Sequence, residues 1–382
     1  MYSRIFTLPA TSFFLFGPRG VGKSSLLRSL LPAAPYFDLL DAGLFTRLQA
    51  DPSRLESALP KDARTVVIDE IQRIPEMLNE VHRLIEKRKL RFCLTGSSAR
   101  SLRRKGVNLL AGRAATRHLH PLVMQELTGD FDLQRFLRDG GMPTVWQPGG
   151  AQDYLASYVA TYLKEEVLHE GLTRNLGAFY RFLEAASFSQ GQLLNISSVA
   201  RDCSVERKVV ESYFQILEDL LIGVRLTPFS RRVKREVVTH PKFYFFDCGV
   251  FRAIRPRGPL DSEDEISGAA IETAVFQHLR AWNDYLGNPF AMHFWRSRQD
   301  HEVDFVLYGP KGLHAIEVKR TAHPRAADLA GLHTFKKDFP PAQLHLVYTG
   351  QRHELSDGIN FIPLETFLRN LPELLQAGLG RR

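Results

Sequence analysis

The chain has 382 residues, 44% of them hydrophobic and 24% charged, so it is long enough for two or three domains with ordinary globular cores. No apolar run approaches the ~20 residues of a membrane-spanning helix, and the N-terminal stretch lacks the features of a secretory signal peptide. The net charge of +8 permits a polyanionic partner such as nucleic acid but does not require one.

The spacing of the cysteines and histidines shows no metal or redox site. Cys93, Cys203 and Cys248 are widely spaced and form no metal or redox pair in the sequence, and the 13 histidines form no ligand-spaced cluster. We therefore expect a cytoplasmic protein that contacts no membrane and holds no zinc.

A glycine-rich loop follows the first expected strand, residues 12–16, and precedes an expected helix over residues 25–31. Strand, loop and helix N-terminus together direct backbone N–H groups at a triphosphate, which makes a chance glycine-rich turn a poor alternative. Lys23 would reach the β- and γ-phosphates, and the Ser24 hydroxyl would ligate Mg²⁺. The residues expected to bind the nucleotide are Gly17, Pro18, Arg19, Gly20, Val21, Gly22, Lys23, Ser24 and Ser25.

Two further strands supply the groups that hydrolysis needs. The β-branched run 65–68 ends in Asp69 and Glu70, and a third run, 91–94, leads into Thr95, Gly96, Ser97 and Ser98. Asp69 would hold the Mg²⁺ shell, and Glu70 would polarise the attacking water. The polar groups after the third strand would sense the γ-phosphate. The sequence therefore predicts ATP and Mg²⁺ as ligands, and ATP hydrolysis.

Alternating strand and helix patterns continue to about residue 120, as a doubly wound parallel α/β sheet requires. We expect residues 1–120 to form this P-loop core and residues 121–170 to form a helical lid or connector. Its best linker candidate is 147–150, before a long helical pattern over 153–169.

Residues 171–255 have the outline of a winged helix. Two helical patterns, 197–203 and 205–217, precede two apolar strands, 221–226 and 242–246, that bracket the basic run 230–235. In this interpretation Arg207 and Lys208 face a DNA groove and the basic tip neutralises phosphates. A packing module with a solvated charged loop fits the same pattern equally well.

A spacer over 256–265 is expected to precede the last domain, residues 266–382, which opens with a helix carrying Glu272. In the strand 301–307, alternation predicts that Val303, Phe305 and Leu307 share one face, with Glu302 and Asp304 on the other. In the strand 313–319, Ile316 and Val318 would point to the core.

Glu317 and Lys319 would then project together from the opposite face of that strand. With Asp304 and the upstream Glu272, they match the arrangement of metal-dependent nucleases. Asp304 and Glu317 would hold Mg²⁺, and Lys319 would orient the water or stabilise developing charge. The plain alternative is a solvated strand face bearing a Glu/Lys pair.

Nearly the whole chain resembles a family of prokaryotic AAA-superfamily ATPases that join an N-terminal P-loop module to an uncharacterised C-terminal region. The segments that carry the resemblance are 17–19, 68–75, 94–98, 110–113, 121–122, 241–247, 302–305 and 317–319.

The resemblance implies an AAA-type fold, ATP·Mg²⁺ as ligand, and Ser97 or Thr95 as the sensor residue. It offers Arg113 as an arginine finger acting in trans, which requires a homo-oligomer, with a structural ion pair as the alternative. It also implies a C-terminal mixed α/β domain with a restriction-endonuclease-like fold. We expect an ATPase whose nucleotide state controls a DNA-facing winged helix and a nuclease-like domain. The alternatives are a nucleotide-operated binding switch with an inert nuclease-like domain, and a DNA motor.

Overall fold

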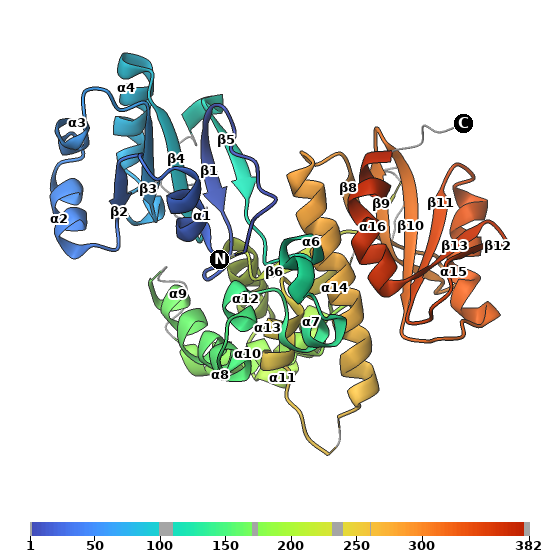
Figure 1. The fold of residues 1–382 in the computed structure, drawn as a ribbon. Helices are drawn as coiled ribbons and strands as arrows, with labels where there is room; N and C mark the ends of the chain where they lie inside the picture. The colour runs from blue at the N-terminus through green and yellow to red at the C-terminus, as the bar shows by residue number, and fades with distance from the viewer. Residues whose placement is uncertain (1, 99–109, 170–174, 231–239, 260, 378–382) are drawn as a thin grey trace. The chain divides into compact units, whose positions relative to one another are not determined.

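The structure is a computed structural model, which describes residues 2–98, 110–169, 175–230, 240–259 and 261–377 (Figure 1). The chain divides into two compact units. The N-terminal unit comprises Ser3–His120 with Asp219–Leu221, and the C-terminal unit comprises Pro121–Glu218 and Ile222–Arg382 together with the first two residues. Within the described ranges, no helix is both long and apolar enough to cross a bilayer.

The N-terminal unit is built on a parallel five-stranded sheet in the order β2-β3-β4-β1-β5. Its inner strands are buried on both faces, which explains their continuous apolar sequences. The strands are β1 (Ser12–Phe16), β2 (Tyr36–Asp38), β3 (Thr65–Asp69), β4 (Arg91–Gly96) and β5 (Ala114–His118).

Helices complete this unit and bury its core, in which Phe14, Ile68 and Leu94 of the sheet meet Met77 and Leu84 of α4. The helical segments are α1 (Lys23–Leu30), α2 (Ala42–Ala50), α3 (Arg54–Ala58), η1 (Ile71–Arg73), α4 (Met77–Arg88) and η2 (Leu110–Gly112). The predicted doubly wound α/β fold of this part is confirmed.

The strand order determines which edge of the sheet carries the predicted nucleotide-binding residues. Because β4 lies between β1 and β3, the loops that follow these three strands open at one edge of the sheet. That edge carries the glycine-rich loop after β1, Asp69 and Glu70 at the end of β3, and Ser97 after β4.

The C-terminal unit begins with a helical region. Its segments are α6 (Met124–Leu127), η3 (Thr128–Asp130), α7 (Leu133–Asp139), η4 (Pro143–Trp146), α8 (Ala151–Ser157), the π-helical turn η5 (Tyr158–Tyr162), α9 (Leu163–His169), α10 (Leu176–Ser187), α11 (Ile196–Cys203), α12 (Arg207–Asp219) and α13 (Cys248–Ile254). The long helix predicted over 153–169 is thus formed by α8, η5 and α9 in succession.

Helices α10, α11 and α12 precede an antiparallel ribbon of β6 (Gly223–Leu226) and β7 (Lys242–Phe245). The segment between α10 and α11 adds isolated bridges to β7 at Gln190 and Leu193. Phe182 and Phe214 pack edge to face at 4.7 Å, which fixes α10 against α12.

The last part of the unit is a mixed six-stranded sheet in the order β12-β13-β11-β10-β9-β8. Helix α15 covers one face, and α14 packs against the other. The elements are α14 (Glu263–Tyr285), β8 (Ala291–Arg296), β9 (Glu302–Gly309), β10 (Gly312–Lys319), α15 (Ala326–Asp338), β11 (Gln343–Tyr348), β12 (Glu354–Ser356), β13 (Ile359–Pro363) and α16 (Leu364–Ala377).

The predicted spacer 256–265 was too long, because α14 already begins at Glu263. Ser262 caps the helix by accepting a hydrogen bond from the Glu265 N–H, and acidic residues fill its first turn. Acidic side chains near a helix N-terminus are favoured by the helix dipole, so a run that resembled a linker is a helix start.

The predicted alternation along β9 was wrong. Val303 and Val306 belong to the core cluster under α15, whereas Phe305 stacks against Phe276 of α14 on the opposite face. The cause is an irregularity in the register of β8 and β9, where two residues of β9, Asp304 and Phe305, stand opposite one residue of β8. Such a bulge re-aims side chains, and here it turns Asp304 inward.

Candidate functional site

The glycine-rich loop between β1 and α1 has a backbone that only glycine tolerates easily. Gly20 and Gly22 have φ of 87° and 92°. A Cβ on Gly17 would lie 2.4 Å from the Leu119 carbonyl oxygen, so this position has no room for a side chain. The loop leads directly into the N-terminus of α1, where unpaired N–H groups favour an anion.

Lys23, the first residue of α1, is folded back over this loop. Its Nζ donates to the carbonyl oxygens of Gly17 at 2.7 Å and Pro18 at 3.2 Å, and the residue is 6% exposed. Phosphate oxygens carry negative charge and are stronger acceptors for an ammonium than these neutral carbonyls, which favours exchange of the carbonyls for a phosphate.

Arg4 supports the loop and was not predicted from the sequence. Its guanidinium donates to the Val21 carbonyl at 2.8 Å and to the His120 carbonyl at 2.6 Å. The contact ties the N-terminal segment to the loop and to the end of β5. An isolated arginine in an irregular segment gives no local pattern that could have revealed it.

Asp69 is almost fully buried at the end of β3, and both of its carboxylate oxygens accept hydrogen bonds. Thr95 Oγ donates to one oxygen, and the Tyr36 hydroxyl donates to the other. Burial raises the pKa of Tyr36, and the Asp69 carboxylate raises it further, while a hydrogen bond to Ser24 opposes the shift. Tyr36 therefore contacts Asp69, one of the two predicted Mg²⁺ ligands of this site, and its pKa responds to the other, Ser24.

Glu70 has a left-handed backbone, with φ of 59°, which is costly for a residue with a side chain. Its N–H donates to Thr95 Oγ at 3.1 Å, which holds it in that conformation. Gln72 then donates to the Glu70 carboxylate and to Ser97 Oγ, the latter at 3.0 Å. The structure thus brings Glu70 and Ser97 together through Gln72.

The two residues that the resemblance offered as sensor have different surroundings. Thr95 contacts Asp69 and the backbone of Glu70, whereas Ser97 is joined to the Glu70 side chain through Gln72. A side chain at Gly96, between them, would displace Gln72, because a Cβ there would lie 2.7 Å from Gln72 Oε1.

Arg113 lies at the opposite edge of the same sheet. Ala114, the next residue, pairs with Ser12 at the start of β1, so the length of β1, ~13 Å at the usual rise per residue, separates Arg113 from the glycine-rich loop. Its Nε pairs with Glu86 Oε1 at 2.5 Å. Arg113 therefore cannot reach the loop of its own chain, and the finger role stays a prediction for a neighbouring copy.

The residues at the carboxyl edge of the N-terminal sheet fit the predicted ligands, ATP and Mg²⁺. A backbone concavity with a lysine addresses a triphosphate, and a serine hydroxyl beside an aspartate supplies the oxygen donors that Mg²⁺ prefers. Arg19 is half-buried and Ser25 is exposed at the rim of the loop.

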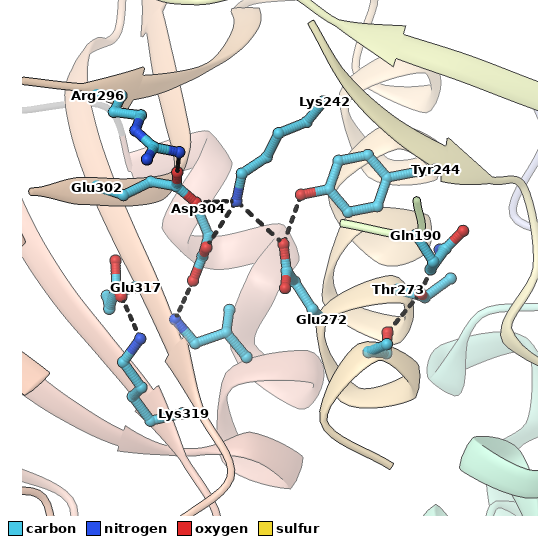
Figure 2. Close-up of polar contacts among 12 residues, drawn as sticks. Gln190, Lys242, Tyr244, Glu272, Thr273, Arg296, Glu302, Asp304, Glu317 and Lys319 are labelled. Atoms are coloured by element: carbon cyan, nitrogen blue, oxygen red, sulfur yellow. Dashed lines mark hydrogen bonds and ion pairs between the residues drawn. The ribbon is translucent and has the colours of Figure 1, made fainter. Parts of the chain in front are cut away.

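A second polar cluster lies in the C-terminal unit and contains all four residues of the predicted nuclease constellation. Figure 2 shows that its centre is the ammonium of Lys242, on β7, which the sequence analysis did not assign to any site. Lys242 Nζ lies 2.6 Å from a Glu302 oxygen, 2.9 Å from Asp304 Oδ1 and 3.5 Å from Glu272 Oε1. A signal was available in the sequence, because Lys242 begins an otherwise aromatic and buried strand, and a buried lysine needs acidic partners.

The other members complete this network. Tyr244 donates to Glu272 at 2.5 Å, and the Val318 N–H donates to Asp304 Oδ2 at 2.9 Å. Lys319 pairs with Glu317 at 2.5 Å, so these two side chains project together as predicted.

Burial and neighbouring charges shift the pKa values of the acids in this cluster. Burial raises the pKa of Glu272 to about 7, although Lys242 opposes the shift. Burial, with Asp304 nearby, raises the pKa of Glu317 well above its usual range. Burial acts on Asp304 in the same direction, but Lys242 and Lys319 outweigh it and lower the pKa of Asp304.

As arranged, these residues do not fit a divalent cation. Within the described ranges, no group of three or more histidine, cysteine, aspartate or glutamate residues could hold a metal ion. The three carboxylates that converge here do so on an ammonium. The prediction that Asp304 and Glu317 hold Mg²⁺ has no support from this geometry.

Two of the predicted DNA-facing residues lie on α12. Arg207 and Lys208 are exposed at the N-terminus of α12, and Arg207 pairs with Glu211 at 3.2 Å. The basic positions 231–235 lie outside the described residues.

Comparisons with known proteins divide the chain into three. Residues 10–128 match the family model described as an AAA domain. Residues 130–261 and 267–367 match two domains of unknown function, DUF8612 and DUF4143. The N-terminal part is therefore an AAA-type nucleotide-binding domain. The first of the other two models runs without a break across position 170, where we predicted a boundary between connector and winged helix.

Relatives in two mycobacteria match most of the chain. An uncharacterized protein of Mycobacterium tuberculosis, Rv2008c, and one of Mycobacterium bovis, Mb2031c, are each 28% identical to it over 365 residues. The match covers 93% of this chain and 80% of each relative. Neither name states an activity.

Two solved structures are distantly similar. The Thermotoga maritima RuvB Holliday junction branch migration motor is 18% identical, with 56% of this chain and 82% of that chain covered and a TM-score of 0.30. Protein VC1899 from Vibrio cholerae is 11% identical, with 97% and 98% covered and a TM-score of 0.21. At these scores neither likeness bears on fold or function.

Proposed function

We propose that the N-terminal unit binds and hydrolyses ATP with Mg²⁺. The observation that supports this most directly is the buried Lys23 ammonium, held on carbonyls of a loop whose backbone is shaped to receive phosphates. The match to an AAA domain over residues 10–128 supports the same proposal.

Each residue at the carboxyl edge has a distinct task in this proposal. Lys23 leaves its loop carbonyls and binds the β- and γ-phosphates, while Ser24 and Asp69 hold the metal ion and its water. Bound Mg²⁺ supplies positive charge that neutralises the phosphates. Glu70, aimed by Gln72, accepts a hydrogen bond from the attacking water, and Ser97 reports whether the γ-phosphate is present.

The test is nucleotide binding by the full chain, with Lys23→Ala as the variant and Lys61→Ala, an exposed lysine of the same unit, as the matched control. Fluorescent ATP should bind to the wild type and to Lys61→Ala only when Mg²⁺ is present, and its affinity for Lys23→Ala should fall at least tenfold. Equal affinities for all three proteins would remove the proposal.

We further propose that the nucleotide state controls DNA binding by residues 171–255. Three helices followed by an antiparallel ribbon support this, as do two exposed basic residues at the start of α12, Arg207 and Lys208. The net charge of +8 is consistent with a phosphate-rich partner.

Salt dependence distinguishes this proposal from a packing role. The variant with alanine at both Arg207 and Lys208 should bind duplex DNA more weakly, and the slope of log affinity against log salt should fall by about two. A wild-type protein without measurable DNA affinity in any nucleotide state would leave residues 171–255 as a protein-contact module. The ATPase proposal would stand in that case.

A further inference from the structure

The ammonium of Lys242 contacts two acids of the nuclease-like constellation, Glu272 and Asp304, and the neighbouring Glu302. The Lys242 side chain is 2% exposed, and its charge is shared among Glu272, Glu302 and Asp304 (Figure 2). Burial would lower the pKa of Lys242, but the surrounding acidic groups outweigh it and raise the pKa well above its usual range. The ammonium is therefore held at the point where these three carboxylates converge.

The charge balance leaves little attraction for a second cation. Three bases, Lys242, Lys319 and Arg296, pair with four acids, Glu272, Glu302, Asp304 and Glu317, and Arg296 also pairs with Asp300, which is exposed and therefore screened by water. Full ionisation of the groups other than Asp300 gives a net charge of −1. A divalent ion would thus bring excess positive charge into a buried site, where such charge is poorly screened.

The carboxylate oxygens are also largely in use. Tyr244 and Lys242 both contact Glu272 Oε1, and the Val318 N–H and Lys242 occupy the two oxygens of Asp304. Glu317 Oε2 is buried without a hydrogen-bond partner, but one oxygen is far short of the octahedral set that Mg²⁺ demands.

Further contacts join the same elements. Tyr244 of β7 stacks on Phe276 of α14 at 4.5 Å, and the chain after β6 pairs with β8 through a hydrogen bond of 2.6 Å from the Phe229 N–H to the Phe294 carbonyl. The ribbon is thus anchored to the helix and to the sheet on both sides of Lys242.

We infer that the Lys242 ammonium replaces a catalytic metal ion, so that the cluster is a structural joint between the β6–β7 ribbon and the α14–β9–β10 layer and cleaves no nucleic acid. The ribbon and the mixed sheet then move as one body, and a signal at either is transmitted to the other.

Manganese binding by the full chain without nucleotide tests this inference, with Glu317→Gln as an isosteric variant that should fold. Wild type and Glu317→Gln should give the same Mn²⁺ titration by electron paramagnetic resonance, and neither should cut single- or double-stranded DNA with Mg²⁺ or Mn²⁺. A Mn²⁺ site or a cleavage activity that the wild type has and Glu317→Gln lacks would overturn the inference.

The structural half of the inference is tested by Lys242→Met, which leaves several buried carboxylates without their ammonium. We expect the melting midpoint of the C-terminal unit to fall by about 6–12 °C, because breaking a buried ion pair is strongly destabilising. Added Mn²⁺ should recover part of this loss in Lys242→Met and have no effect on the wild type. A midpoint within about 1 °C of the wild type would show that the ammonium does not hold the joint.

Discussion

Replacing Glu70 with glutamine separates nucleotide binding from hydrolysis. The amide keeps the size of the side chain, and its oxygen can still accept the hydrogen bond from Gln72. The geometry at the edge of the sheet therefore stays, while the negative charge that polarises water is lost. We expect binding of Mg·ATP to be retained and turnover to be lost.

The magnitude follows from the role assigned to Glu70. A positioned carboxylate base contributes about 10²–10⁴ in rate, or about 2.7–5.4 kcal/mol of barrier. Gln72→Leu offers a graded comparison, because it keeps the charge of Glu70 and removes the hydrogen bonds that Gln72 donates to Glu70 and to Ser97. A hydrogen bond to a charged group contributes about 1.5–3 kcal/mol, so turnover in Gln72→Leu should fall by about 10- to 150-fold.

Phosphate release at saturating Mg·ATP measures both variants, and fluorescent ATP measures their affinity. The expected order of turnover is wild type, then Gln72→Leu, then Glu70→Gln, with affinities that differ little. Turnover of Glu70→Gln within threefold of the wild type would refute the role of Glu70, and a lower turnover in Gln72→Leu than in Glu70→Gln would refute the role of Gln72.

Two other predictions concern assembly and pH. If Arg113 completes the site of a neighbouring copy, Arg113→Ala should lower turnover by about 10³–10⁵-fold. Mixing Arg113→Ala with Lys23→Ala should restore part of the activity. Unchanged turnover in Arg113→Ala would leave the ion pair with Glu86 as the role of this residue. Burial lowers the pKa of His345 to about 3, so the folded state binds fewer protons than the unfolded state below pH 6.5, and stability is lost as pH falls. Between pH 6.5 and 5 this effect lowers the free energy of unfolding of the wild type by about 2 kcal/mol. In urea unfolding, the free energy of His345→Gln should therefore fall by about 2 kcal/mol less than that of the wild type over the same range. Equal losses in both proteins would contradict the prediction.

Local chemistry made much of the N-terminal site predictable. A glycine-rich loop between a strand and a helix constrains its own backbone, and the run ending in Asp69 and Glu70 is too β-branched and apolar to be anything but a buried strand. The contacts of Tyr36 and Arg4 could not be found in this way, because they join segments far apart in the chain and leave no spacing in the sequence.

The C-terminal site shows where such reasoning fails. Periodicity assumes an unbroken strand, and the bulge at Asp304 violates it without any glycine or proline to mark it. Lys242 lies 62 residues before Asp304, so its arrival in the cluster depends on the docking of the ribbon. A constellation of acids and a lysine is the same in sequence whether it surrounds a metal ion or another lysine.

The central claim is that the N-terminal unit holds a triphosphate with magnesium, and calorimetric titration of the nucleotide-free wild type with ATP tests it most directly. We expect saturable one-site binding with Mg²⁺, and much weaker binding with EDTA in its place. Binding that is absent, or that is equally strong with and without Mg²⁺, would contradict it.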